Sequence, residues 1–276
     1  MKALRTGLAL AALAALVVAG ACGREGSTVF SPNNGALAFT RFVNAVSDSG
    51  AGDWRFVDAV ENSPAAFGLR FRDMFPGSGY QSTGAGSRHL RIFQTSSDIV
   101  QTQKVFFDTT FNFVAGTHYT LIAAGTMRDR TAKLFILTDD FADPGAQVAF
   151  RVFNTGAGTV DVYASPTGGT SALPAPMAAA VPNFVATKYI PIAPGTLSLR
   201  AFASGTTSFP AMLDVVVPGG LPADRAANLT AVGGATQPGS ALTVFIFPRS
   251  VAGSAAFSFT SPGIGFIVDR NPPSGF

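Results

Sequence analysis

The chain of 276 residues contains two histidines, His89 and His118, which limit the chemistry that its side chains could perform. Hydrolysis through a serine, a histidine and an aspartate needs the histidine as general base. Both histidines fall in segments whose pattern predicts strands, and the Gly-x-Ser-x-Gly turn of many hydrolases does not occur in the sequence. The sequence therefore predicts that the protein is not an enzyme. The alternative is a hydrolase with an atypical carboxylate pair, such as Asp58 and Glu61.

Metal ligation has one candidate, a short acidic run. Zinc sites of ordinary composition are excluded, because the sequence has a single cysteine and no His-Glu-x-x-His motif. Asp139, Asp140 and Asp143 could hold Ca²⁺ together with backbone carbonyls. They lack the glycine and the distal glutamate of an EF-hand loop, and their other interpretation is a solvated linker with turn-capping aspartates. We therefore assign no metal and no cofactor. Calcium binding by these three aspartates stays an open alternative.

Aromatic and arginine side chains offer a further route to binding. Trp54, Tyr80, Arg55 and Arg88 are the candidate binding residues, because an arginine over an aromatic face can contact sugar or peptide. Trp54 falls on a predicted strand, so its alternatives are a core tryptophan and an exposed binding residue. The polar loop 74–88 is the expected contact loop, because loops on rigid sandwiches carry recognition.

An export signal occupies the N-terminus. Lys2 and Arg5 precede an uncharged run over residues 7–20 that is rich in Ala and Leu. This pattern is typical of a secretory signal peptide, and the run is too short to span the ~30 Å apolar core of a bilayer. The sequence Ala-Gly-Ala then precedes Cys22, which resembles the lipobox that a lipoprotein signal peptidase cleaves. Residues 1–21 are therefore predicted to be a lipoprotein signal peptide.

Cys22 is the predicted lipidation site. It is the only cysteine, so it forms no disulfide within the chain, and acylation would anchor it in a membrane. In Gram-negative bacteria, an aspartate two residues after the lipidated cysteine keeps a lipoprotein in the inner membrane. This chain has Arg24 at that position, so the resemblance to this rule indicates the outer membrane if the organism has one. Residues 22–36 are rich in Gly, Ser, Pro and Asn, and we expect a flexible tether. The predicted location is the cell envelope, with the membrane as a partner through the lipid.

Composition favours an all-β protein. Only two Glu and four Lys are present, and these residues usually fill exposed helix faces. The 25 Phe give a large apolar load, which excludes intrinsic disorder. A net charge of +3 excludes strong nucleic-acid binding through a basic face. An envelope protein or a polysaccharide is the expected kind of partner.

Internal similarity divides the chain into two units. Phe39–Asn44 matches Ala149–Asn154 at an offset of 110, with Arg41 over Arg151. Three further matches follow in the same order at an offset of 108: Asp53 over Asp161, 120–125 over 228–233, and 133–137 over 241–245. We therefore predict tandem units over 37–141 and 146–250, with the tail 251–276 as a candidate last strand of the second unit.

Each unit contains about seven short runs rich in β-branched and aromatic residues, which is the pattern of an immunoglobulin-like antiparallel β-sandwich. The first unit offers 37–46, 54–60, 65–72, 88–94, 103–113, 117–125 and 132–138. The second offers 146–154, 159–164, 184–192, 196–203, 211–217, 227–233 and 241–247.

Several of these motifs resemble the DUF4397 family. They are Arg-Phe-Val-Asn at 41–44, Asp-Val-Tyr at 161–163, the run 119–125, and Leu-Thr-Asp-Asp at 137–140. The resemblance covers about residues 37–250 and implies an exported bacterial protein, often a lipoprotein, with duplicated β-sandwich units and no established activity. It transfers no functional residues. The combined prediction is a non-enzymatic, envelope-anchored lipoprotein with a structural or interaction role; the alternative is a carbohydrate-binding or adhesin-like module that recognises polysaccharide.

Overall fold

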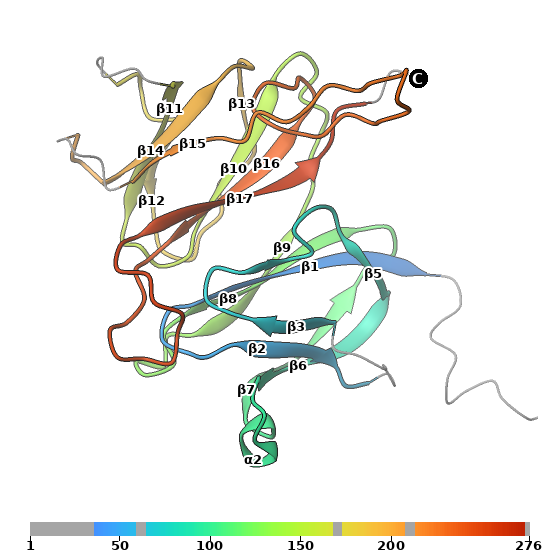
Figure 1. Ribbon diagram of the computed structural model, residues 1–276, viewed down its shortest axis with the longest axis vertical. Helices are drawn as coiled ribbons and strands as arrows, with labels where there is room; N and C mark the ends of the chain where they lie inside the picture. Colours follow the sequence, from blue (N-terminus) through green and yellow to red (C-terminus); the bar gives the residue numbers. More distant parts are fainter. Residues whose placement is uncertain (1–35, 59–64, 168–172, 208–212, 274–276) are drawn as a thin grey trace, which may run out of the picture.

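Four β-sheets in two sandwiches make up the computed structural model of the protein (Figure 1). The structure describes residues 36–58, 65–167, 173–207 and 213–273. The predicted all-β sandwich fold is confirmed. The predicted signal peptide, Cys22 and the tether up to residue 35 lie outside the described residues.

Sheets A and B form the first sandwich, and sheets C and D form the second. Sheet A consists of β4 (Met74–Phe75), β5 (Gln81–Gly84), β1 (Leu37–Val46), β8 (His118–Gly125) and β9 (Lys133–Thr138). Sheet B consists of β3 (Ala66–Leu69), β2 (Gly52–Phe56), β6 (Gly86–Gln94) and β7 (Val105–Phe113), with the short helix α2 (Ile99–Thr102) between the last two. Sheet C consists of β13 (Ile190–Ile192), β10 (Val148–Asn154), β16 (Ala241–Phe247) and β17 (Gly263–Arg270). Sheet D consists of β12 (Ala178–Val181), β11 (Val160–Pro166), β14 (Leu197–Ala203) and β15 (Leu213–Val216).

The same topology occurs in both sandwiches. β1 runs parallel to β8, with Arg41 opposite Thr120, and β10 runs parallel to β16, with Arg151 opposite Thr243. The other pairs of described strands are antiparallel. The expectation of purely antiparallel sheets is therefore corrected at one pair in each unit. These strands can run parallel because the chain passes through sheet B or sheet D before it returns.

The strand register also corrects two of the four repeat matches. β16 lies beside β10 as β8 lies beside β1, so 241–245 corresponds to the start of β8 and not to 133–137. The segment 227–233, expected to be a strand, makes only isolated bridges, such as Leu221 to Val232. The place of β9 is taken by β17, which lies in the tail and pairs with β16. The constant offset failed because the second unit has a long connection between β15 and β16.

The central strands of sheets A and C, which are β1, β8, β10 and β16, are buried on both faces. Successive side chains of a strand point to opposite faces. In β1, Phe42 and Val46 therefore pack inside the first sandwich, while Val43 and Ala45 face the second sandwich. The sheets are stacked in the order B, A, C, D.

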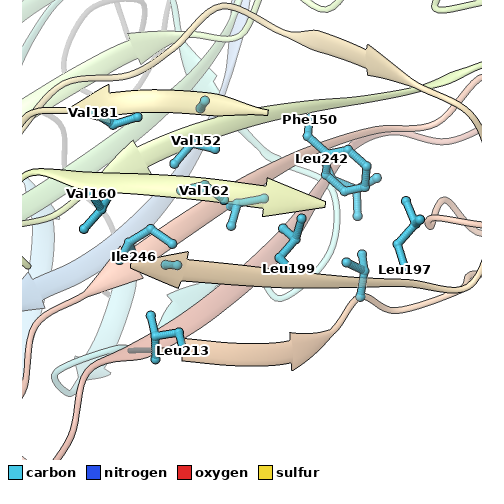
Figure 2. Close-up of a cluster of buried hydrophobic side chains, with 14 of the residues drawn as sticks. Phe150, Val152, Val160, Val162, Val181, Leu197, Leu199, Leu213, Leu242 and Ile246 are labelled. Carbon is cyan, nitrogen blue, oxygen red and sulfur yellow. The ribbon is translucent and has the colours of Figure 1, made fainter. Parts of the chain in front are cut away.

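Three apolar cores hold this stack together. One fills the first sandwich, and another fills the second, where Phe150 and Leu242 of sheet C meet Val162 and Leu199 of sheet D (Figure 2). The third lies between the sandwiches and joins Ile122 of sheet A to residues of sheet C. Its fully buried members from sheet C are Phe153, Phe245, Phe247 and Ile267. The two sandwiches therefore share a core.

Candidate functional site: a buried ion-pair cluster between the sandwiches

A cluster of charged side chains continues the interface between sheets A and C. Arg41 in β1 and Arg151 in β10 lie on the facing surfaces of the two sheets, and their exposed fractions are 0% and 4%. The alternation that points Val43 and Phe153 into the shared core also points these arginines into it. A buried guanidinium must find carboxylates and other acceptors, because burying an unpaired charge is very costly.

Arg41 finds its partners in both sandwiches. Its Nε donates to Oγ1 of Thr120 at 2.7 Å, and its guanidinium lies 4.5 Å from the ring centre of Tyr80, both in the first unit. Its Nη2 donates to Oδ1 of Asp269, and its Nη1 donates to the carbonyl of Val268 at 3.2 Å, both in the second unit. One side chain therefore bridges β1 to β17.

Arg151 repeats this arrangement in the opposite direction. Its Nε donates to Oγ1 of Thr243 at 3.0 Å, and its guanidinium lies 4.8 Å from the ring centre of Tyr189, both in the second unit. Its Nη2 donates to Oδ1 of Asp139 at 2.5 Å, and its Nη1 donates to the carbonyl of Thr138 at 3.3 Å, both in the first unit. The contacts of Arg41 and Arg151 are thus reciprocal, as an approximate twofold axis between the two units would produce.

The two carboxylates complete the network. Asp139 also accepts from Thr120 at 2.6 Å and from Tyr80 at 2.9 Å. In the second unit, Asp269 accepts from the equivalent threonine at 2.7 Å and from the equivalent tyrosine at 2.8 Å. Each carboxylate therefore holds hydroxyls of its own unit and an arginine of the other.

Burial and the neighbouring charges shift the pKa values of the arginines and tyrosines of the cluster. Burial opposes the charged form of Arg41, but Asp269 and Asp139 outweigh it and raise the pKa of this arginine. Burial, together with the Asp139 carboxylate, raises the pKa of Tyr80, so its hydroxyl keeps its proton and donates. Two positive and two negative side chains balance, and each is hydrogen-bonded. Such a network fixes the relative position of the sheets, because its buried groups are hydrogen-bonded to one another.

Arg72 forms a second bridge between the sandwiches. Its Nη2 donates to the carbonyls of Pro248 at 2.6 Å and Ser261 at 2.5 Å, in the connection between β16 and β17. The guanidinium lies 4.2 Å from the ring centre of Phe259. Partial burial lowers the pKa of Arg72 to about 10. The backbone N–H of Val251 also donates to the carbonyl of Ser47 at 2.8 Å, so this connection is tied to the first sandwich.

The candidate binding residue Trp54 lies inside the first sandwich. Its exposed fraction is 0%, and its ring centre is 5.2 Å from that of Phe42. The hypothesis of an exposed Trp54 is therefore wrong. Trp54 is a core residue, which was the alternative interpretation. The physical reason is that its position in β2 points the indole at sheet A.

Trp54 gives a simple test of this placement, because it is the only tryptophan. We expect its fluorescence maximum at short wavelength and almost no quenching by acrylamide until the protein unfolds. Emission at the wavelength of free tryptophan, with full quenching in the folded state, would contradict the placement.

The other candidate binding residues do not form one surface with Trp54. Tyr80 belongs to the ion-pair cluster described above. Arg55 is 45% exposed at its side chain, and its Nη2 lies 3.9 Å from Oδ2 of Asp53. The Nε of Arg88 donates to Asp58 at 2.7 Å, and the guanidinium lies over a core phenylalanine.

The three aspartates of the calcium hypothesis do not converge. The carboxylate of Asp139 accepts a hydrogen bond from Arg151, while Asp140 is exposed. Asp143 accepts from Arg270 at 2.7 Å, and this bond, with one from the N–H of Gly145, lowers the pKa of Asp143. Within the described ranges, no group of three or more potential metal ligands is present.

The two histidines occupy separate places. His89 contacts Asp108 at 2.5 Å on the outer side of sheet B, and Arg91 donates to the same carboxylate at 2.8 Å. His118 stacks on Phe39 with ring centres 4.7 Å apart. Of the proposed carboxylate pair, Asp58 bonds to an arginine, and Glu61 lies outside the described residues.

Sequence reasoning missed most of the ion-pair cluster. The match of Arg41 to Arg151 was the available signal, because an arginine repeated inside two apolar strands needs buried partners. Asp139 was visible only as part of an acidic run. Asp269 and Tyr189 carried no signal, since they reach the cluster from a tail and from a segment interpreted as an ordinary strand.

The matching family model is DUF4397, a domain of unknown function, over residues 38–163. The resemblance to this family is confirmed over these residues. The match runs from β1 into β11 and ends short of the expected boundary near residue 250. It includes Arg41, Asp139 and Arg151, whereas Asp269 lies beyond it. No curated protein matches the chain. Among the described residues, no helix has the length and apolar character needed to cross a bilayer.

The recurring polar residues of the DUF4397 motifs have structural roles here. Asn44 donates from Nδ2 to the carbonyl of Leu69 at 2.8 Å, and Asn154 donates likewise to the carbonyl of Val181 at 3.0 Å. Each bond ties the end of an inner strand to the outer sheet. Asp161 accepts from the backbone N–H groups of residues 180 and 205, which ties strand β12 and the turn after β14 to β11.

These hydrogen bonds predict a pH dependence for Asp161. The N–H groups of Ala180 and Gly205 lower the pKa of its carboxyl below the ordinary 3.8. Since the unfolded state then binds the proton more readily, Asp161 stabilises the fold above pH 3.8 and loses this effect as pH falls through its lowered pKa. We expect the stability difference between wild type and Asp161→Asn, measured by urea unfolding, to shrink in acid. A difference that stays constant down to pH 2 would contradict this assignment.

Proposed function

We propose that the protein is a non-catalytic lipoprotein of the cell envelope, held by a lipid on Cys22, in which the two sandwiches act as one structural or interaction body. The observation that carries the anchoring is the Ala-Gly-Ala sequence before Cys22, at the end of an apolar run. A polar segment separates this cysteine from Leu37, where β1 begins. This segment would hold the sandwiches away from the bilayer.

The ion-pair cluster supports a non-catalytic role. Arg41, Arg151, Asp139 and Asp269 neutralise one another inside the protein, where a substrate would not reach them. A catalytic group needs an accessible reacting partner within hydrogen-bond distance. The same four residues, with the shared apolar core, make the pair of sandwiches suitable as a stiff spacer or a display surface.

Metabolic labelling tests the anchoring. The full chain would be expressed in a Gram-negative host with labelled palmitate, beside the variant Cys22→Ser. We expect label on the wild type in the membrane fraction, and neither label nor membrane retention for the variant. Membrane retention without any label, equal in both proteins, would overturn the proposed anchor.

A pull-down from envelope extracts tests the interaction role. Bound protein and bound sugar would be analysed in parallel on the immobilised chain. Reproducible retention of one envelope protein would support the proposal. Retention of polysaccharide alone would favour the carbohydrate-binding alternative, although the burial of Trp54 removes the aromatic platform that motivated it.

A further inference from the structure

Strand β7 is a long open edge. It spans nine residues, and its strand partner among the described residues is β6 alone. Asp108, Thr110 and Asn112 are exposed on its outer face. An edge strand presents unpaired N–H and C=O groups to any strand that can lie beside it.

An irregularity at Phe106 interrupts β7, but its regular part from Phe107 to Phe113 lacks the other usual protections of an edge strand. Proteins blunt edge strands with lysine, proline or very short length. β7 contains no lysine and no proline, and its one charged residue, Asp108, is bonded to Arg91 and His89. The equivalent edge in the second sandwich, β15, has only four residues and is followed closely by Pro218. One unit therefore protects this edge and the other leaves it open.

The open edge is complementary to itself. The pairing with β6 is irregular at Phe106, so the regular part of β7 runs from Phe107 to Phe113 and is centred on Thr110. In an antiparallel pair about Thr110, Phe107 would face Phe113 of the other copy. Asp108 would face Asn112, so no like charges would meet. Aromatic pairs, paired threonines and an amide opposite a carboxylate each stabilise neighbouring strands.

We propose that β7 pairs antiparallel with β7 of a second copy, so that two B sheets join into one continuous sheet across a twofold axis at Thr110. Such a contact is closed, because each edge is consumed by the other. The half-buried Phe107 and Phe111, which pack against the first core, would extend that core across the axis.

A single introduced cysteine tests this pairing. In the full chain carrying Cys22→Ser and purified in detergent, Thr110→Cys would place two thiols directly opposite at the axis. Opposed residues of antiparallel strands have Cα atoms about 4.5–5.5 Å apart, within the range of a disulfide. The matched control is Val216→Cys, which is 53% exposed on the equivalent edge β15. We expect mild oxidation to give mostly disulfide-linked dimer at 110 and mostly monomer at 216. Equal cross-linking of both would overturn the proposal.

A second measurement covers the case in which the cysteine variant fails to fold. Sedimentation equilibrium of the wild type should show a concentration-dependent dimer. Thr110→Lys, which would set two positive charges against each other, should raise the dissociation constant at least tenfold, and Val216→Lys should leave it unchanged. A monomeric wild type at high micromolar concentration, or an equal effect of the two lysines, would also overturn the proposal.

Discussion

Replacing Asp139 with asparagine is expected to lower the free energy of unfolding by about 3–5 kcal/mol, because removing one partner of a buried pair leaves an uncompensated charge. The affected charge is Arg151, whose Nη2 lies 2.5 Å from the Asp139 carboxylate and whose exposed fraction is 4%. The threonine and tyrosine hydroxyls that donate to this carboxylate would also lose a charged acceptor. In thermal unfolding followed by circular dichroism, a midpoint lower by roughly 10 °C is expected.

The adjacent Asp140 provides the matched control. It has the same chemistry but is exposed, so Asp140→Asn should change stability by no more than about 0.5 kcal/mol. If the two variants lost similar stability, the buried ion pair would not hold the sandwiches together. A stable Asp139→Asn variant would lead to the same conclusion.

The second large effect is expected in the shared apolar core, from Phe247→Ala. Phe247 is 1% exposed, and its ring centre lies 6.2 Å from that of Phe71 in the first sandwich. Truncating a buried phenylalanine removes its burial and leaves a cavity, which costs about 3–5 kcal/mol. Because the ring packs on both sandwiches, urea unfolding should report this loss for the whole protein.

Phe257→Ala serves as the comparison for this variant. Phe257 is 53% exposed in the connection between β16 and β17, so its truncation should cost less than about 1 kcal/mol. A loss at Phe247 as small as that at Phe257 would indicate that the facing surfaces of sheets A and C are not packed in solution.

The strands themselves could be predicted largely from local pattern. Runs rich in β-branched and aromatic residues over 37–46 and 146–154, with turn residues between runs, indicated β1 and β10 close to their observed bounds. Short elements were missed, such as β12 over Ala178–Val181, because a run of alanines has low strand propensity and gains its place through pairing with β11. The parallel pairing of β1 with β8 was also missed, since no local signal carries strand order.

The candidate site could be predicted far less well, for a physical reason. Its partners come from distant segments, so the bond from Arg41 to Asp269 depends on how two sheets stack. The hypothesis of an aromatic binding surface included Tyr80. In the structure, the hydroxyl of Tyr80 donates a hydrogen bond to the buried carboxylate of Asp139 instead. The burial of Trp54 could not be predicted from its place in a strand. Successive side chains point to opposite faces of the sheet, and the sequence does not show which face is covered.

The two sandwiches form one cooperative body through their shared core and reciprocal ion pairs. Differential scanning calorimetry of the full chain tests this cooperativity most directly, because independent domains unfold in separate steps. The structure predicts one transition in which the calorimetric and van't Hoff enthalpies agree. Two resolved transitions, each assignable to one sandwich and unchanged by Asp139→Asn, would contradict it.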